Sequence, residues 1–198
     1  MATKKIILVR HGSTRDNGQG AKDKIRGWSN APLDDRGVID AQRAAKELKG
    51  LPITLLASSD LQRAAQTAGI IQKVTGIQMA TPSQFFRPWN LGVYTGMESE
   101  KAHPVIQQMA TEHPDQPVQG GESFHSFERR FMHGLKLLCM HEGLPALVTH
   151  YRCICLLEAW KDNGFQPDGS IDHGRFCVKG EPPGHVKEFD VPVERIPR

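Results

Sequence analysis

The chain has 198 residues, of which 38% are hydrophobic and 24% are charged, and its formal net charge is +3. These values are typical of a soluble globular protein, long enough to bury about 70% of its unfolded surface without a disulfide or metal staple. The mild positive charge is compatible with an anionic small molecule. It does not indicate a nucleic-acid partner, because no run of lysines and arginines forms a basic stripe.

The N-terminus and the cysteines argue against membrane attachment and metal binding. Two lysines are followed by only four apolar residues (6–9), which is too short for a signal peptide or a spanning helix, so we expect a cytoplasmic protein without a membrane partner. The spacing of the cysteines lacks the paired pattern of a zinc site. We therefore expect buried free thiols, no metal and no cofactor. The cysteines are Cys139, Cys153, Cys155 and Cys177.

The first third of the chain alternates strands and helices. Residues 4–9 (KKIILV) are a short, continuously apolar run, as in a strand buried on both faces. A helix is predicted over 38–49, a second buried strand over 53–58, and a second helix over about 60–74 with Ser59 as its N-cap. Short connections join these elements, so the pattern predicts an α/β domain with a largely parallel sheet. The apolar face of the first helix is formed by Val38, Ala41, Ala45 and Leu48.

Residues 80–120 have a different composition, rich in Pro, Gln, His and Gly. Helical periodicity is confined to about 104–112, so we interpret this segment as a short insertion over the sheet edge within a single domain spanning 1–198. No second domain is predicted.

The last part of the chain returns to regular elements. A helix is predicted over 122–141, a third buried strand over 144–149 and a helix over 152–162. Two strand-like pieces follow, at 175–180 and 185–191. The helix at 122–141 carries an apolar stripe that is typical of a core-facing surface, formed by Phe124, Phe127, Phe131, Leu135 and Leu138.

Two of the predicted buried strands end at a histidine, at His11 and at His150. In open α/β sheets, ligands bind at the carboxyl ends of the strands, so both imidazoles should lie at one rim. Arg10 precedes His11, and Arg63 lies one turn into the helix that follows the second strand. The N-terminus of that helix also favours an anion. These four residues predict an anion site.

The residue types at this rim suit phosphoryl transfer. Two guanidiniums can clamp a phosphoryl group bidentately, and a neutral imidazole is a competent nucleophile toward phosphorus. A second, protonated imidazole can neutralise charge that develops on the equatorial oxygens. Gly12 would let the backbone pass close to the phosphate. Alone, each residue has a commoner explanation, such as a surface histidine or a solvated arginine. Their joint position favours the phosphoryl site.

Several segments carry a family resemblance over residues 4 to about 158. In chain order they are VRHGSTRDN at 9–17, GWSNAPLDDRGVIDAQRAA at 27–45, SSDLQRAAQTA at 58–68, GGES at 120–123 and LVTHY at 147–151. These motifs, with their order and spacing, resemble the histidine phosphatase superfamily, in its phosphoglycerate-mutase-like branch.

The resemblance implies a fold and a set of roles. It implies a three-layer α/β/α sandwich, with His11 as the nucleophile that becomes phosphohistidine. Arg10, Arg63 and His150 would form the phosphate pocket. Asn17 would contact the phosphoryl group or the substrate, although by itself an asparagine there reads as a turn residue.

The chain departs from this family at the general acid. The family usually carries a glutamate four residues before the glycine that is Gly92 here, and this chain has Pro88, which can donate no proton. A good leaving group would need less acid help than an alkyl phosphate. Glu98 and Glu100 are near in sequence, but each is more typical of a solvated charge at a helix start. The acid stays unassigned.

The sequence also leaves the roles of three aromatic residues open. Tyr151 follows His150 where the family commonly has glycine, and its ring could narrow the pocket or pack outward. Trp89 and Tyr94 could line the mouth of the substrate pocket or belong to the core.

The sequence therefore predicts a metal-independent phosphatase that hydrolyses a phosphomonoester or phosphoramidate through phospho-His11. Its partner would be a phosphorylated small molecule or a phosphoprotein, and the oligomeric state is open. One alternative is a non-catalytic phospho-ligand-binding module that lost the general acid. Another is a phosphoglycerate-type mutase, although the insertion is shorter than those typical of such mutases.

Overall fold

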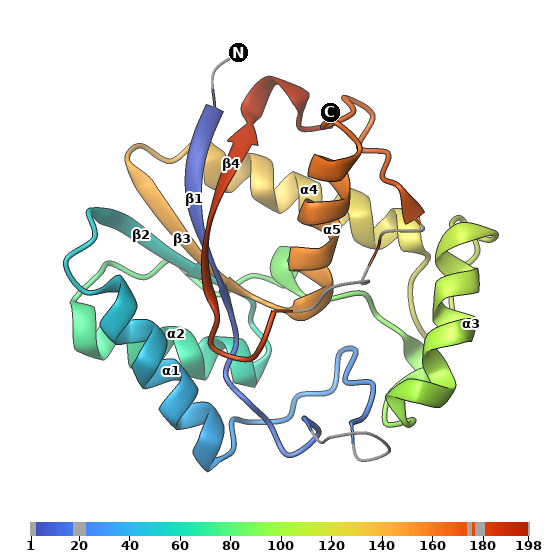
Figure 1. Cartoon of the computed structure of the whole chain (residues 1–198), viewed down its shortest axis with the longest axis horizontal. Helices are drawn as coiled ribbons and strands as arrows, with labels where there is room; N and C mark the ends of the chain where they lie inside the picture. The colour runs from blue at the N-terminus through green and yellow to red at the C-terminus, as the bar shows by residue number, and fades with distance from the viewer. Residues whose placement is uncertain (1–2, 18–22, 174–175, 177–180, 198) are drawn as a thin grey trace.

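A central sheet organises the molecule. The computed structural model describes residues 3–17, 23–173, 176 and 181–197, and these contain four strands in the order β2-β3-β1-β4 (Figure 1). Three of the strands are parallel, whereas β4 pairs with β1 in the antiparallel sense. The bounds are β1 Thr3–Arg10, β2 Ile53–Ser58, β3 Leu144–Thr149 and β4 Val186–Pro192. The predicted, largely parallel sheet is confirmed.

Helices cover both faces of this sheet. Alternate side chains of β1 point to opposite faces. Ile7 and Val9 join a core cluster with α1 and α2, and Ile6 and Leu8 join a second cluster with α4 and α5. This arrangement is the three-layer α/β/α sandwich that the family resemblance implied. The helices are α1 Asp35–Leu48, α2 Gln62–Thr75, α4 Phe124–Cys139 and α5 Tyr151–Asp162.

Residues 80–120 pack beside the sheet, and their buried side chains Phe86, Trp89 and Leu91 join the core cluster of α4 and α5. They contain α3 (Ser99–Thr111), at the right of Figure 1, and two short 3-10 segments, η2 (Gln84–Phe86) and η3 (Gly92–Tyr94). A further 3-10 segment, η5 (Val193–Arg195), follows β4. The helix α3 starts five residues before the predicted start, because the backbone N–H and the hydroxyl of Ser99 both donate to Asp23, a contact distant in sequence.

The starts of α1 and α2 correct two predictions. The side chain of Asp34 accepts from Gly37 N at 2.7 Å, so α1 begins earlier than predicted, and Val38 is 38% exposed rather than buried. The N-cap position of α2 is Leu61, not Ser59. The orphan N–H of Gln62 donates instead to the Asn30 side chain at 2.9 Å.

The remaining elements agree with the sequence. The bounds of α4 and α5 lie within two residues of the prediction, and the apolar stripe of α4 is buried. The predicted strand 185–191 is β4, whereas 175–180 lies outside the described residues except for buried Phe176. Cys139, Cys153 and Cys155 are buried and form no disulfide within the described part of the chain, to which Cys177 does not belong. Within the described ranges, no helix has both the length and the apolar character needed to span a membrane.

Candidate active site

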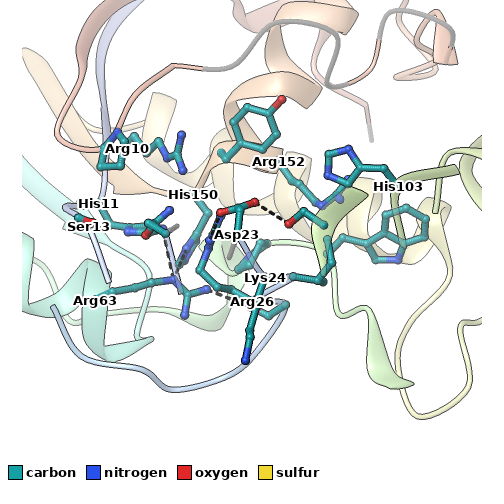
Figure 2. Close-up of a pocket in the computed structure, with 18 of the residues that line it drawn as sticks. Arg10, His11, Ser13, Asp23, Lys24, Arg26, Arg63, His103, His150 and Arg152 are labelled. Atoms are coloured by element: carbon teal, nitrogen blue, oxygen red, sulfur yellow. Dashed lines mark hydrogen bonds and ion pairs between the residues drawn. The ribbon is translucent and has the colours of Figure 1, made fainter. Parts of the chain in front are cut away.

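A cavity of about 410 Å³ opens at the carboxyl ends of β1 and β3. Every residue that the sequence placed at the rim lines this cavity: Arg10, His11, Asn17, Arg63 and His150. Figure 2 shows Arg10, His11 and Arg63 together at one side of it. The volume is in the range of small-molecule sites.

His11 is held in the tautomer that a nucleophile requires. Its Nδ1 lies 2.7 Å from the carbonyl oxygen of Gly12. A carbonyl oxygen can only accept, so Nδ1 carries the proton and Nε2 keeps its lone pair. Arg63 Nε donates to that Nε2 at 3.2 Å, which fixes the direction in which the lone pair faces.

Arg63 joins the two histidines. Its Nε also donates to Nδ1 of His150 at 3.2 Å, and the side chain is 1% exposed. Its Nη1 and Nη2 donate to the backbone carbonyls of Ser29 and Gly27, at 2.6 and 2.9 Å. Arg10 Nη1 likewise donates to the carbonyl of Glu181. Arg63 thus uses all three of its nitrogens within the protein, whereas the buried Nε of Arg10 has no hydrogen-bond partner among the described residues, so a bidentate contact from Arg10 stays a prediction.

His150 presents its other ring nitrogen as a donor. Because Nδ1 accepts from Arg63, the proton of the neutral ring is on Nε2. This Nε2 is buried and has no hydrogen-bond partner within the described part of the chain. The ring centroids of His11 and His150 are 5.1 Å apart. A phosphoryl oxygen beside His11 is a suitable acceptor for this N–H.

Burial and positive charge set the protonation of the site. Burial, and then the charge of Arg63, lower the pKa of both His11 and His150 well below the ordinary value. Both imidazoles are thus neutral at pH 7, and protonation of His150 beside a bound phosphoryl group stays a prediction. Burial also lowers the pKa of Arg10 to about 10 and that of Arg63 to about 9, so both remain cations at neutral pH.

Asn17 has the turn role that its type suggests, and it also lines the cavity. Its side-chain Oδ1 accepts from the backbone N–H and the hydroxyl of Thr14, at 2.9 and 3.0 Å. It thereby shapes the loop after β1. Its position at the cavity is compatible with a ligand contact as well.

Gly12, which follows His11, allows the loop after β1 to pack closely against α1. A Cβ on Gly12 would collide with the backbone carbonyl of Gly37 in α1, and one on Gly37 would collide with the carbonyl of Ser13. The expectation that Gly12 lets the backbone approach the phosphate is replaced by this close contact between the loop and the helix.

Pro88 occupies a rigid position at the cavity wall. Its carbonyl accepts from Trp28 Nε1 at 2.8 Å and from Arg130 Nη2 at 3.1 Å. The guanidinium of Arg87 lies over the Trp28 ring, 4.5 Å from its centroid, and pairs with Asp60 at 2.7 Å. The wall thus keeps its shape at the place where the family usually has its acid.

The structure locates the aromatic and acidic residues whose roles the sequence left open. Trp89 lines the cavity although its side chain is fully buried, and Tyr94 packs against the core. The Tyr151 ring lines the cavity and lies 5.2 Å from the Arg10 guanidinium carbon. Glu98 and Glu100 are not lining residues; Glu98 pairs with Lys101 instead.

Sequence reasoning missed several polar lining residues, including the exposed Lys24 and Arg36. Four others are Asp23, Arg26, His103 and Arg152. Arg26 directly precedes the family motif at 27–45, and Arg152 directly follows the one at 147–151. This proximity was the one signal in the sequence that could have pointed to them. Asp23 and His103 had none, since only tertiary contact brings them to the cavity. Within the described residues, no cluster of His, Cys, Asp and Glu side chains could hold a metal ion.

Comparisons with known proteins agree with this geometry. Residues 6–169 match the family model of the histidine phosphatase superfamily, branch 1. A protein of Cronobacter sakazakii named probable phosphoglycerate mutase GpmB is 32% identical over 152 residues, covering 73% of this chain and 68% of its own. The Yersinia pestis (strain Pestoides F) protein of the same name is 33% identical over 160 residues, covering 77% and 72%.

Solved structures are similar over nearly the whole chain. The structure titled mycobacterial hydrolase 1 has a TM-score of 0.76 at 20% identity, covering 96% of this chain and 92% of its own. The Thermus thermophilus protein TTHB049 has a TM-score of 0.67 at 26% identity, covering 95% and 94%. With these matches, the chain belongs to the histidine phosphatase superfamily, branch 1.

Proposed function

We propose that the protein is a metal-independent phosphatase that works through a phosphohistidine on His11. The observation that carries this proposal is the hydrogen-bond chain from Gly12 O through the His11 ring to Arg63 Nε. It holds a neutral imidazole whose unprotonated Nε2 accepts from Arg63, at a cavity that Arg10 and His150 also line; the phosphoryl group would have to displace this contact before Nε2 attacks. The acceptor atom of the phosphoryl group would be this Nε2.

The reaction would proceed in two displacements. The His11 Nε2 lone pair attacks phosphorus in line, the P–O bond of an ester or the P–N bond of a phosphoramidate breaks, and the leaving oxygen or nitrogen takes a proton from solvent. Water then attacks the phosphorus of phospho-His11, which releases phosphate and regenerates the imidazole. The guanidiniums and the His150 N–H would stabilise charge on the equatorial oxygens in both steps.

Pro88 limits the substrates that such a site can turn over. Without a carboxyl at this wall position, an alkoxide leaving group receives no positioned proton, and general acid help contributes about 10²–10⁴-fold elsewhere. The proposal therefore favours phosphoramidates, aryl phosphates and anhydrides over alkyl phosphomonoesters. The cavity volume of about 410 Å³ fits a phosphorylated small molecule. We also propose a cytoplasmic location.

Because water can enter the cavity, we favour hydrolysis of the phosphohistidine over a mutase reaction. Lys24 and Arg36 line the cavity and are exposed, so solvent can enter on their side and reach the phosphorylated ring. A mutase must instead keep water from its phosphohistidine. The mutase remains the second candidate because relatives at 32% and 33% identity carry the name probable phosphoglycerate mutase.

The test is hydrolysis of p-nitrophenyl phosphate with EDTA present. We expect turnover by the wild type and a loss of at least about 10³-fold for His11→Ala, as for removal of other nucleophiles. His133→Ala is the matched control, since this exposed histidine on α4 is not a lining residue, and it should keep full activity.

Other outcomes separate the alternatives. Equal activity of wild type and His11→Ala would contradict the phosphohistidine route. Tight phosphate binding with no turnover of any aryl phosphate or phosphoramidate would identify the protein as a binding module. Isomerisation of 3-phosphoglycerate after priming by 2,3-bisphosphoglycerate, with little hydrolysis, would identify a mutase.

A further inference from the structure

Arg10 is held by a segment that lies far along the chain. Its Nη1 donates to the backbone carbonyl of Glu181, 171 positions further on. The backbone N–H of Arg10 donates to the carbonyl of His185 at 3.0 Å, and the N–H of Gly184 donates to the carbonyl of Arg10 at 3.1 Å. We call residues 181–185, which directly precede β4, the C-terminal strap. The strap thus contacts both the backbone and the side chain of Arg10.

One end of the C-terminal strap is held by packing against α1. The carbonyl of Pro183, which also lines the cavity, accepts from Arg43 Nη2 at 2.9 Å. A Cβ atom on Gly184 would lie 2.8 Å from both the Cβ and the carbonyl oxygen of Asp40 in α1. Strap and helix are therefore in close contact here, and the backbone bonds between the strap and Arg10 rest on this support.

The other end of the C-terminal strap, at Glu181, is held by charge. Oε1 of Glu181 accepts from Lys187 Nζ at 3.2 Å, and its Oε2 lies 3.1 Å from Nε2 of His185. Lys187, in β4, also pairs with Glu158 of α5 at 2.8 Å. The side chains of these three paired residues, Glu158, Glu181 and Lys187, are only 28–31% exposed, so solvent screens the pairs less than it screens fully exposed ones. Lys187 thus ties Glu181 to two elements of the sandwich.

The position of the Glu181 carbonyl affects how Arg10 can meet an anion. The Arg10 side chain is 8% exposed, and its buried Nε has no hydrogen-bond partner among the described residues. The ring of Tyr151 lies 5.2 Å from the guanidinium carbon. A guanidinium that is bonded at Nη1 and stacked by a ring holds its remaining donors in one direction before a ligand arrives. It therefore loses less entropy when a phosphoryl oxygen binds.

We propose that Glu181 is a positioning residue for the anion site: its carbonyl holds the Arg10 guanidinium, and its carboxylate, paired with Lys187, holds that carbonyl in place. The C-terminal strap lies beyond residue 169, where the match to the family model ends. This inference rests on the proposed function only for the statement that the bound anion is a phosphoryl group. It makes the ion pairs of Lys187 a determinant of phosphate affinity, although Lys187 is not among the lining residues of the cavity.

Binding of inorganic phosphate, measured by isothermal titration calorimetry, tests this role without turnover. Glu181→Ala and Lys187→Met should each raise the Kd for phosphate at least about fivefold, because a misplaced guanidinium makes a weaker charge-assisted contact. The double variant should bind phosphate no more weakly than the weaker single variant, since both changes act on one carbonyl. Lys187→Arg keeps the cation and should restore the Kd to within about twofold of the wild-type value.

Two further measurements assign the effect to Arg10 rather than to loss of structure. In an Arg10→Gln background, Glu181→Ala should weaken phosphate binding by less than about twofold more, because the carbonyl then has no guanidinium to hold. The matched control is Glu188→Gln, which breaks the exposed 2.7 Å pair with Lys5 between the same two strands and should bind phosphate like the wild type. The melting temperatures of Glu181→Ala, Lys187→Met and this control should agree within about 4 °C.

Three results would overturn the proposal: an unchanged Kd in Glu181→Ala and Lys187→Met, a Kd in Lys187→Arg as high as that in Lys187→Met, or the full further loss when Glu181→Ala is added to Arg10→Gln. If Glu181→Ala does not fold, the two Lys187 variants decide, because they leave the sequence of the C-terminal strap unchanged. Phosphate affinity that depends on Glu181 in a protein that never forms phosphohistidine would contradict the proposed function and leave the positioning role intact.

Discussion

At the scale of single residues, Arg63 determines how the site is set up. It is fully buried, its Nη1 and Nη2 donate to backbone carbonyls, and its Nε faces both imidazoles. Burial first, and then the charge of Arg63, lower the pKa of His11 and His150 and keep both rings unprotonated. The nucleophile is therefore available at a pH where an ordinary histidine would be largely protonated.

The pH dependence of kcat/KM should show this. This parameter reports the free enzyme, in which the pKa of His11 lies well below 6.5. After correction for ionisation of the substrate, activity on p-nitrophenyl phosphate should not fall as the pH drops through 6.5. On the alkaline side it should fall as the pH rises through about 9, where Arg63 loses its proton and its charge.

A variant separates the two limbs of that profile. Arg63→Gln lacks the group with the pKa of about 9, so the alkaline limb of its lower activity should move up toward about 10, the pKa of Arg10. If the wild-type profile instead fell with an apparent pKa near the ordinary 6.5 of histidine, the buried cationic environment would not control the nucleophile.

At the scale of elements, the contact between the loop after β1 and the helix α1 positions His11. Gly12 and Gly37 bring the two backbones so close that neither position has room for a Cβ atom. The N–H of Gly12 donates to Thr67 in α2 at 3.1 Å, and the N–H of Ser13 donates to Asp40 in α1 at 3.1 Å. Two helices thus hold the backbone of the two residues that directly follow the nucleophile.

The substitution Gly12→Ala should therefore destabilise the fold. A methyl group against the Gly37 carbonyl must displace backbone, and overpacking of this kind costs about 1–3 kcal/mol. Thermal or urea unfolding measures the effect. The control is Gly69→Ala in α2, where a Cβ meets nothing within 4 Å and should stabilise the helix by up to about 1 kcal/mol. Equal stability of the two variants would contradict the close contact.

At the scale of the whole molecule, the fold could be predicted from local sequence patterns, whereas much of the candidate site could not. The apolar runs of β1, β2 and β3 and the periodic face of α4 are short-range signals, so these elements were predicted within a few residues. The rim that collects Arg10, His11, Arg63 and His150 also followed, because parallel strands end at one edge.

The parts that were missed depend on contacts distant in sequence. The start of α3 is fixed by Asp23, and the start of α2 is supplied by the side chain of Asn30. The direction of the Arg63 donors depends on the carbonyls of Gly27 and Ser29. No local pattern records such contacts.

The most direct test of the central claim is detection of the covalent intermediate. Wild-type protein mixed rapidly with a phosphoramidate or an aryl phosphate, quenched in base and examined by mass spectrometry, should carry one phosphoryl group on His11. The label should be labile to acid and stable to base, as a phosphoramidate bond is. Turnover of the same substrate with the phosphoryl group on another residue, or with no label at any time before the steady state, would contradict nucleophilic catalysis by His11.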